Sequence, residues 1–353
     1  MALHGGVLLY GLDEQPNGAR PGLTPADLDA TIERISNIAA TGVSPPVRPR
    51  FDRIETGGGW GVLFVRIPAS PLAPHQAAKR YWCRSGHGNQ PMADEEVRRY
   101  LAAQRASRDW GAAALDTFVA DDPFTVSQNG HPHILLLPVV EDPTRLLRAI
   151  GTQHRDWAPF LEEVGRAGDR RTRHPSFQTR AGGVALVRGI GPSRVAPEGR
   201  EATAQDLELG EYGSVRLYHG GAVTVPQSAE GPHANEAVIG AMTRLALSAG
   251  RLVIERTGYS QPWLAGIHVS GLRGAQSLIE ERRREQSSFE SGVDHRYSGN
   301  EYRKVVELLG DDLVEDKPRG AIDALLGEPF RGLHGGANYD VFDETYHLDD
   351  PPL

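Results

Sequence analysis

The stretch Gly5–Glu14, GGVLLYGLDE, decides how the N-terminal part of the chain folds. A glycine pair opens a short apolar run and acidic residues close it, which is the pattern of a buried β-strand. Thr24 and Pro25 then begin an amphipathic helix, with Thr24 as the N-cap and Pro25 at the first helical position. The apolar face of this helix recurs at three- and four-residue spacing: Leu28, Ile32, Ile35 and Ile38.

Two more strands and a helix follow in the same part of the chain. Val62–Ile67 is apolar, is entered from the glycine-rich turn Gly57–Gly59 and is closed by a proline. Arg80–Arg84 alternates polar and apolar side chains, which predicts a third strand. A helix from Asp94 to about Arg108 completes an N-terminal lobe.

The rest of the chain reads as a second lobe, so the fold class is α+β with two lobes, the N-terminal one a mixed sheet with helices. The predicted domains are 1–108, a linker at 109–130, a second α+β domain at 131–337 and an acidic tail at 338–353. The strands expected in the second domain are His133–Val140, Gly182–Ile190, Ser214–Tyr218 and Trp263–Val269, and Asp206–Glu211 is expected to be a strand or a loop. The expected helices include Ala234–Ala249, Tyr302–Leu309 and Ala321–Leu326.

Charge is distributed unevenly along the chain. The 353 residues carry a formal net charge of −8, which by itself argues against a nucleic-acid partner. Residues 311–353, however, carry 11 acidic and three basic side chains, which account for the whole excess. Residues 144–200 carry 11 arginines and five acids, so an anionic partner for the body of the chain stays possible.

Cysteine content and missing motifs narrow the function classes. The single cysteine, Cys83, cannot form an internal disulfide, which favours a reducing, cytoplasmic compartment. There is no apolar run long enough to predict a membrane span. Walker A, Gly-x-Ser-x-Gly and His-Glu-x-x-His motifs do not occur, so we expect no cofactor and no active site of those kinds.

The order of the N-terminal elements resembles the Schlafen AlbA_2 domain, as found in bacterial proteins. The resemblance rests on the Gly5–Glu14 strand, the helix after it, VLFVRIPAS at Val62–Ser70, and YWCRSG at Tyr81–Gly86. Pro74 and the helix at Asp94 match further elements, so the resemblance covers residues 1 to about 108. It implies nucleic-acid binding, with DNA or RNA as the partner.

The same resemblance raises the question of nuclease activity. Related Schlafen proteins cut RNA through three carboxylates, and Asp13 matches the third of these positions. The family's first strand and helix, which carry the other two, are absent, so the domain is expected to be N-terminally truncated unless the chain starts further upstream. One carboxylate cannot hold a catalytic metal, so cleavage is not expected. The missing strand leaves an open sheet edge, which predicts a homo-oligomer or a substitute strand.

Basic residues supply the candidate nucleic-acid contacts. Arg80 and Arg84 flank Tyr81 and Trp82 and face one side of a predicted strand, where arginine fits phosphate and the aromatic rings could stack on bases. Lys79 extends this surface, as do Arg48, Arg50, Arg53 and Arg66. The alternative is an ordinary solvated strand face over a core that contains Trp82.

A second basic cluster falls in the arginine-rich segment and consists of Arg166, Arg170, Arg171 and Arg173. It predicts either a phosphate-binding loop or a solvated turn. His131 and His133 have a spacing compatible with metal binding on a strand, but no second ligand pair lies nearby in sequence, so no metal is expected.

Three functions stay open from the sequence. The first is a non-catalytic nucleic-acid-binding or regulatory protein. The second is an oligomeric assembly module, and the third is a metal-dependent nuclease whose missing carboxylates come from upstream or from a partner chain.

Overall fold

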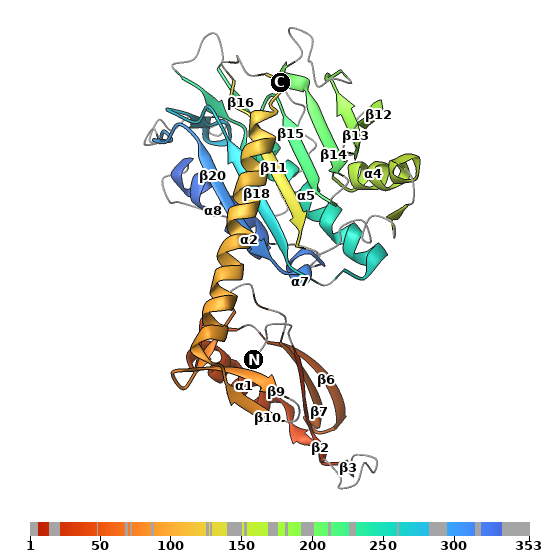
Figure 1. Ribbon diagram of the computed structural model, residues 1–353, viewed down its shortest axis with the longest axis vertical. Helices are drawn as coiled ribbons and strands as arrows, with labels where there is room; N and C mark the ends of the chain where they lie inside the picture. Colours follow the sequence, from red (N-terminus) through yellow and green to blue (C-terminus); the bar gives the residue numbers. More distant parts are fainter. Residues whose placement is uncertain are drawn as a thin grey trace. The chain divides into compact units, whose positions relative to one another are not determined.

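The computed structural model describes residues 6–13, 22–47, 49–67, 70, 73–85, 88–124, 127, 129–139, 150–151, 154–168, 176–180, 183–191, 201–210, 213–225, 231–259, 261–281, 295–314 and 319–333. The chain forms two compact units, residues 1–106 and 107–353, which are described separately (Figure 1). Helices and mainly antiparallel strands occur in both, so the fold is α+β, as predicted. The predicted acidic tail lies outside the described residues.

The first sheet of the N-terminal unit is built around β7 (Trp60–Ile67), which confirms the predicted strand there. β1 (Gly6–Tyr10) and then β4 (Ala26–Asp27) pair along one side of β7, and β6 (Arg50–Gly57) pairs along the other. β6 has no counterpart in the sequence prediction, because RFDRIETG shows neither an apolar run nor a clean alternation.

Helix α1 (Leu28–Thr41) covers one face of this sheet. Leu28 packs with Leu63 and Val65 of β7 in a small buried core. The predicted start, with Thr24 as N-cap and Pro25 as first helical residue, is wrong by three residues. Residues 26–27 pair with β7 as β4, so the backbone there is extended, and Asp27 caps the helix by accepting a hydrogen bond from the Ala30 N–H at 3.0 Å.

A second small sheet completes the N-terminal unit, with a two-stranded ribbon beside it. The sheet order is β10 (Gly88–Pro91), β9 (Arg80–Ser85), β8 (Gln76–Ala77) and β5 (Val43–Ser44). The ribbon pairs β2 (Leu12–Asp13) with β3 (Gly22–Leu23). The predicted strand at Arg80–Arg84 is therefore confirmed as the inner strand of this sheet.

Helix α2 (Asp94–Ala120) is longer than the sequence predicted. It ends at Ala120 rather than near Arg108, so the first part of the predicted 109–130 linker is helical. Leu115 and Phe118 lie one turn apart and are fully buried in the C-terminal unit. Small residues before them, including Gly111, made this segment look irregular in sequence although they allow close packing against Leu264.

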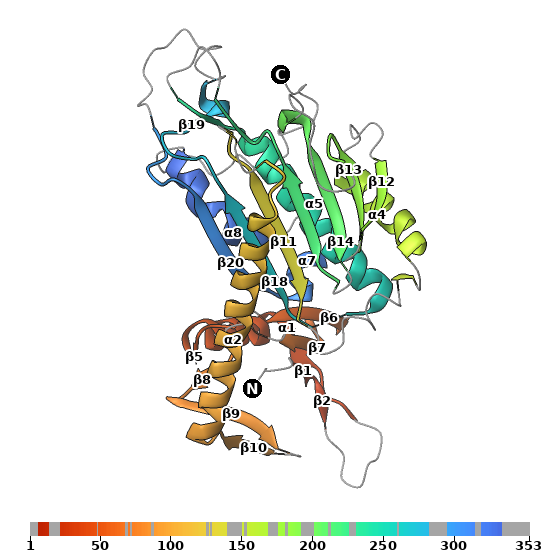
Figure 2. The ribbon, with the colours of Figure 1, turned by 45° about the horizontal axis from the view of Figure 1, so that its top comes forward.

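The C-terminal unit contains a seven-stranded antiparallel sheet (Figures 1 and 2). Its order is β12 (Ser176–Arg180), β13 (Gly183–Arg188), β14 (Gln205–Gly210), β15 (Val215–His219), β11 (Pro132–Pro138), β18 (Trp263–Val269) and β20 (Tyr302–Leu308). A small sheet of β16 (Val223–Thr224), β17 (His233–Ala234) and β19 (Gln276–Ser277) lies beside it, and η2 (Glu201–Thr203) is a single 3-10 turn.

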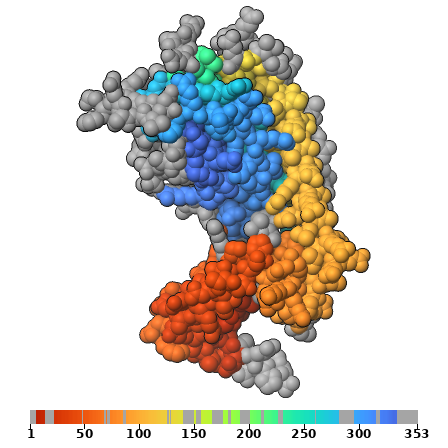
Figure 3. All heavy atoms as spheres, turned by 90° about the vertical axis from the view of Figure 1, so that its left-hand side faces the viewer, coloured from red at the N-terminus to blue at the C-terminus, as the bar shows by residue number. Residues whose placement is uncertain are grey.

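Helices cover both faces of the large sheet. One face packs against α4 (His154–Gly168), α5 (Glu236–Thr257), α7 (Gly310–Val314) and α8 (Arg319–Leu333), forming the main apolar core. The C-terminal half of α2 packs on the other face (Figure 2). Figure 3 shows β20 and α8, in blue, gathered on one surface of this unit. Helix α5 is long and apolar enough to span a membrane, but half of its apolar window is buried in the core.

Strand β20 corrects another prediction. Tyr302–Leu309 was expected to be helical, but Tyr302–Leu308 pairs antiparallel with β18 along its whole length. The β-branched pair Val305 and Val306 suits a strand, and pairing with a buried neighbour outweighs the local helical pattern.

Candidate nucleic-acid interface

The turn between β8 and β9 places a lysine at the tip of a hairpin. Ala78 and Lys79 both have positive φ, 51° and 63°, as a two-residue hairpin turn requires. Lys79 is exposed there, directly before the two arginines of β9. The turn therefore places Lys79 and Arg80 next to each other, and Arg84 follows near the other end of β9.

Alternation along β9 separates its side chains between two faces. Arg80, Trp82 and Arg84 share one face, whereas Tyr81 and Cys83 lie on the other. Both arginines are exposed, and neither forms an ion pair with any residue that the structure describes. The aromatic ring between the arginines is therefore that of Trp82, and Tyr81 does not share their face.

Trp82 and the neighbouring strand fix the shape of this face. The Trp82 Nε1–H donates to the Ala77 carbonyl at 2.9 Å, which holds the partly exposed ring against its own hairpin. Across the ladder, exposed Asn89 of β10 pairs with Arg84. We call the set Lys79, Arg80, Trp82, Arg84 and Asn89 the basic face.

The other basic residues predicted for this surface are differently placed. Arg53 pairs with Asp29 at 2.8 Å, and Arg66 pairs with Asp52 at 2.8 Å, so their charges are compensated. Arg50 lies on β6 beside Arg66, and Arg48 is outside the described residues. Within the described part of the N-terminal strands, the arginines that form no ion pair are therefore those of the basic face.

The arginine cluster of the C-terminal unit is only partly described. Arg166 lies in the last turns of α4, and its side chain is outside the described part. Arg170, Arg171 and Arg173 also lie outside the described residues. The phosphate-binding role predicted for these four arginines therefore stays a prediction.

Asp13, the residue matched to a nuclease carboxylate, lies exposed in β2. Its Oδ2 accepts a hydrogen bond from the Thr24 hydroxyl at 2.5 Å, which ties the β2–β3 ribbon to the segment before β4. Within the described residues there is no group of three His, Cys, Asp or Glu side chains able to hold a metal ion.

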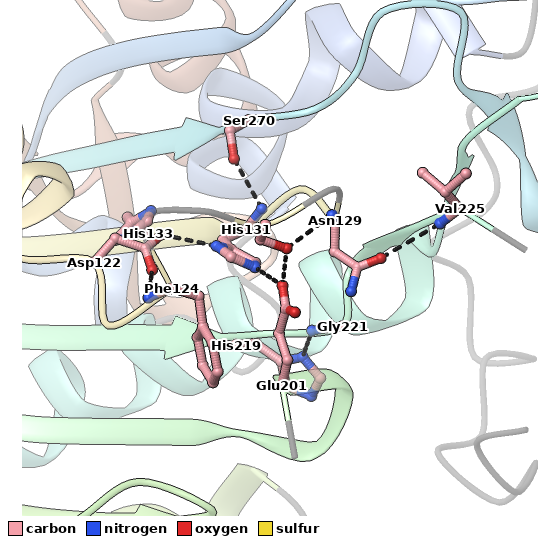
Figure 4. Close-up of polar contacts among 11 residues, drawn as sticks. Asp122, Phe124, Asn129, His131, His133, Glu201, His219, Gly221, Val225 and Ser270 are labelled. Atoms are coloured by element: carbon pink, nitrogen blue, oxygen red, sulfur yellow. Dashed lines mark hydrogen bonds and ion pairs between the residues drawn. The ribbon is translucent and has the colours of Figure 1, made fainter. Parts of the chain in front are cut away.

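The C-terminal unit holds a buried ionic network that sequence reasoning missed (Figure 4). His131 lies just before β11, with Nδ1 2.8 Å from Asp122 Oδ2 and Nε2 2.7 Å from Glu201 Oε1. The Ser127 hydroxyl donates to the same Glu201 oxygen. His133 Nε2 lies 3.4 Å from Asp122. The two histidines, which the sequence places two residues apart, therefore contact the carboxylates of Asp122 and Glu201.

Protonation follows from this geometry. Burial lowers the pKa of His131, but hydrogen bonds and charge from Asp122 and Glu201 outweigh it and raise that pKa. Burial raises the pKa of Asp122, yet its contacts with His131 bring the pKa below the usual value. Only a doubly protonated imidazole donates to two carboxylates, so His131 is an imidazolium here. Nearby His219 stays neutral, because burial and the charges of Arg188 and His131 lower its pKa to about 4.

The network joins three chain segments around a buried side chain. Asp122 follows α2, His131 precedes β11 and Glu201 begins η2, and the rings of Phe124 and Tyr218 pack around the imidazole. The His131 side chain is only 3% exposed. No local sequence signal marks Glu201, which is 70 positions from His131. We therefore read the network as a structural clamp.

Comparison with known families identifies the N-terminal unit. Residues 3–93 match the family model described as Schlafen, AlbA_2. This segment is a Schlafen AlbA_2 domain. The match includes the basic face and supports a nucleic-acid-related function for the AlbA_2 domain. Comparison of the chain with curated proteins and with solved structures found no match in either set.

Proposed function

We propose that the AlbA_2 domain binds DNA or RNA without cleaving it, and that the basic face makes the phosphate contacts. The observation that carries this proposal is the exposed pair Arg80 and Arg84 on either side of Trp82, for which the described part of the chain supplies no ion-pair partner. Guanidinium groups bind phosphate oxygens bidentately, and they do so best when no carboxylate competes for them.

The residues between and beside the arginines fit the same ligand. The partly exposed indole of Trp82 offers a surface for base stacking, which tolerates any sequence. Asn89 carries an amide able to donate to a phosphate or sugar oxygen. A face of this kind binds the backbone with little preference for sequence.

The chain's acidic net charge does not oppose this function. Charge acts over about 8 Å at physiological ionic strength, so the local field at the basic face matters more than the total. The acids that neutralise Arg53 and Arg66 leave the basic face untouched. We extend the proposal to the C-terminal cluster of Arg166, Arg170, Arg171 and Arg173 as a second phosphate-binding patch.

The proposal is tested with the full chain and the double variant Arg80→Ala/Arg84→Ala. Fluorescence anisotropy with labelled single-stranded DNA, duplex DNA and RNA measures the affinity. The matched control is Arg98→Ala/Arg105→Ala, which removes two exposed charges from α2. We expect the first variant to weaken binding at least tenfold and the control to have a small effect. Equal losses in both variants, or no binding by wild type, would refute the proposal.

The nuclease alternative is resolved with the same oligonucleotides. Incubation with Mg²⁺ or Mn²⁺ should leave them intact on a denaturing gel. Metal-dependent cleavage that disappears in Asp13→Asn would establish the nuclease and contradict the non-catalytic reading.

A further inference from the structure

The edge strand β1 presents an apolar surface that its own sheet does not cover. Among the described residues its only partner strand is β7. Val7 is 59% exposed, Leu8 38% and Leu9 48%. Monomeric proteins protect such an edge with charge, proline or a bulge, and the five residues of β1, GVLLY, contain no charge and no proline.

Register assigns these side chains to two faces. Val7 pairs with Arg66 and Leu9 with Phe64, whereas Leu8 pairs with buried Val65. Val7 and Leu9 therefore lie on the face away from α1, and Leu8 lies on the α1 side. The face away from α1 continues over β6 and β7, where Ile54 is 54% and Trp60 51% exposed.

We propose that β1 pairs antiparallel with β1 of a second copy of this chain, about a two-fold axis through Leu8. The proposal is independent of the proposed nucleic-acid binding. In this register Leu8 lies opposite Leu8 of the second copy, and Val7 lies opposite the second copy's Leu9. Alternate backbone N–H and C=O groups of β1 that point away from β7 become hydrogen-bonded, and the two sheets become one.

The sequence of β1 favours a second copy over a different protein. Its pattern is self-complementary about Leu8, because an aliphatic side chain meets an aliphatic side chain at each of the three central positions. An isologous interface needs this self-complementarity. The strand also lacks a charge that would select a complementary partner. A five-residue contact is small compared with standard interfaces of about 1,600 Å², so we expect a concentration-dependent dimer.

A charge-swap experiment tests both the dimer and its register. Sedimentation equilibrium of the full chain without nucleic acid should show a monomer–dimer equilibrium. Val7→Lys/Leu9→Lys places like charges opposite each other and should weaken the dimer at least tenfold. Val7→Lys/Leu9→Glu places opposite charges at the same positions and should restore most of the affinity. The matched control Ile54→Lys, on a similarly exposed residue of β6, should leave the dimer unchanged.

A cross-link gives a second readout. Paired Cα atoms in antiparallel strands lie about 4.5–5.5 Å apart, within the range that a disulfide bridges. In a Cys83→Ser background, Leu8→Cys should oxidise to a covalent dimer and Ile54→Cys should not. A monomer at every soluble concentration would overturn the proposal. So would a dimer that survives Val7→Lys/Leu9→Lys and does not cross-link through Leu8→Cys.

Discussion

The substitution His131→Gln removes the charge at the centre of the buried network while keeping a side chain able to form hydrogen bonds. In the native structure the imidazolium lies 2.8 Å from Asp122 and 2.7 Å from Glu201. Without it, two carboxylates whose side chains are 14% and 22% exposed face each other with no cation between them. The segments they join are the end of α2, the start of β11 and η2.

The size of the effect follows from burial. Removing one partner of a fully buried ion pair costs about 3–5 kcal/mol, because the remaining charge is left uncompensated. Asp122 and Glu201 keep some contact with water, which screens their repulsion. We therefore expect His131→Gln to lower the free energy of unfolding by about 2–3 kcal/mol near pH 6.

The sign of the pH dependence follows from the raised pKa of folded His131. A group whose pKa is higher in the folded state than in the unfolded state stabilises the folded protein fully at a pH below its unfolded pKa, which is 6.5 for histidine. This stabilisation is lost as the pH rises through the pKa of the folded state. The pKa of Asp122 is lower in the folded state, so Asp122 stabilises the folded protein at a pH above its unfolded pKa of 3.8. That stabilisation is lost as the pH falls through the pKa of the folded state. The stability gap between wild type and variant is thus widest near pH 6 and narrows towards pH 9.

Urea unfolding between pH 5 and pH 9, followed by the fluorescence of buried Trp157 and Trp263, measures this gap. The control His295→Gln changes an exposed histidine of the same unit and should have little effect at any pH. A gap that stays constant or widens as pH rises would refute the assignment of a buried imidazolium.

Two further substitutions test the packing of each unit. Asp27→Ala removes the N-cap of α1 and should destabilise the N-terminal unit by about 1 kcal/mol, whereas Asp27→Ser should retain most of the stability; equal losses would contradict the cap. Phe118→Ala empties a site that is 1% exposed and should cost about 3–5 kcal/mol in urea unfolding. Leu101→Ala, on the exposed part of the same helix, is the control, and a similar cost there would contradict the assigned burial.

The elements that sequence predicted well are those with a strong local pattern. β1, β7 and β18 are apolar runs bounded by turn residues, and each lies where the sequence predicts a strand. The prediction that β1 is buried is wrong, because Val7, Leu8 and Leu9 are exposed. β6 and β20 were missed because their pairing partners, rather than their own pattern, make them strands. The sequence prediction ends helix α2 too early because the small residues in its second half resemble a linker. Their role becomes clear only from the surface against which they pack.

The two candidate sites also differ in whether a local sequence pattern predicts them. Arg80 and Arg84 were predicted from alternation alone, which is a local property of a strand. That alternation also places Trp82, rather than Tyr81, between them. The clamp of Asp122, His131 and Glu201 was not predictable, because η2 and β11 meet only in the folded sheet. The spacing of His131 and His133 is compatible with metal binding on a strand, but the sequence does not show which charged side chains surround His131 in the fold.

The salt dependence of nucleic-acid binding tests the central claim most directly. Each phosphate contact contributes about 0.9 to the slope of log K against log salt concentration for duplex DNA, and about 0.7 for single strands. If Arg80 and Arg84 each contact one phosphate, Arg80→Ala/Arg84→Ala should reduce the slope by about 1.8 on duplex DNA or about 1.4 on single strands. An unchanged slope would show that the basic face does not bind the phosphate backbone.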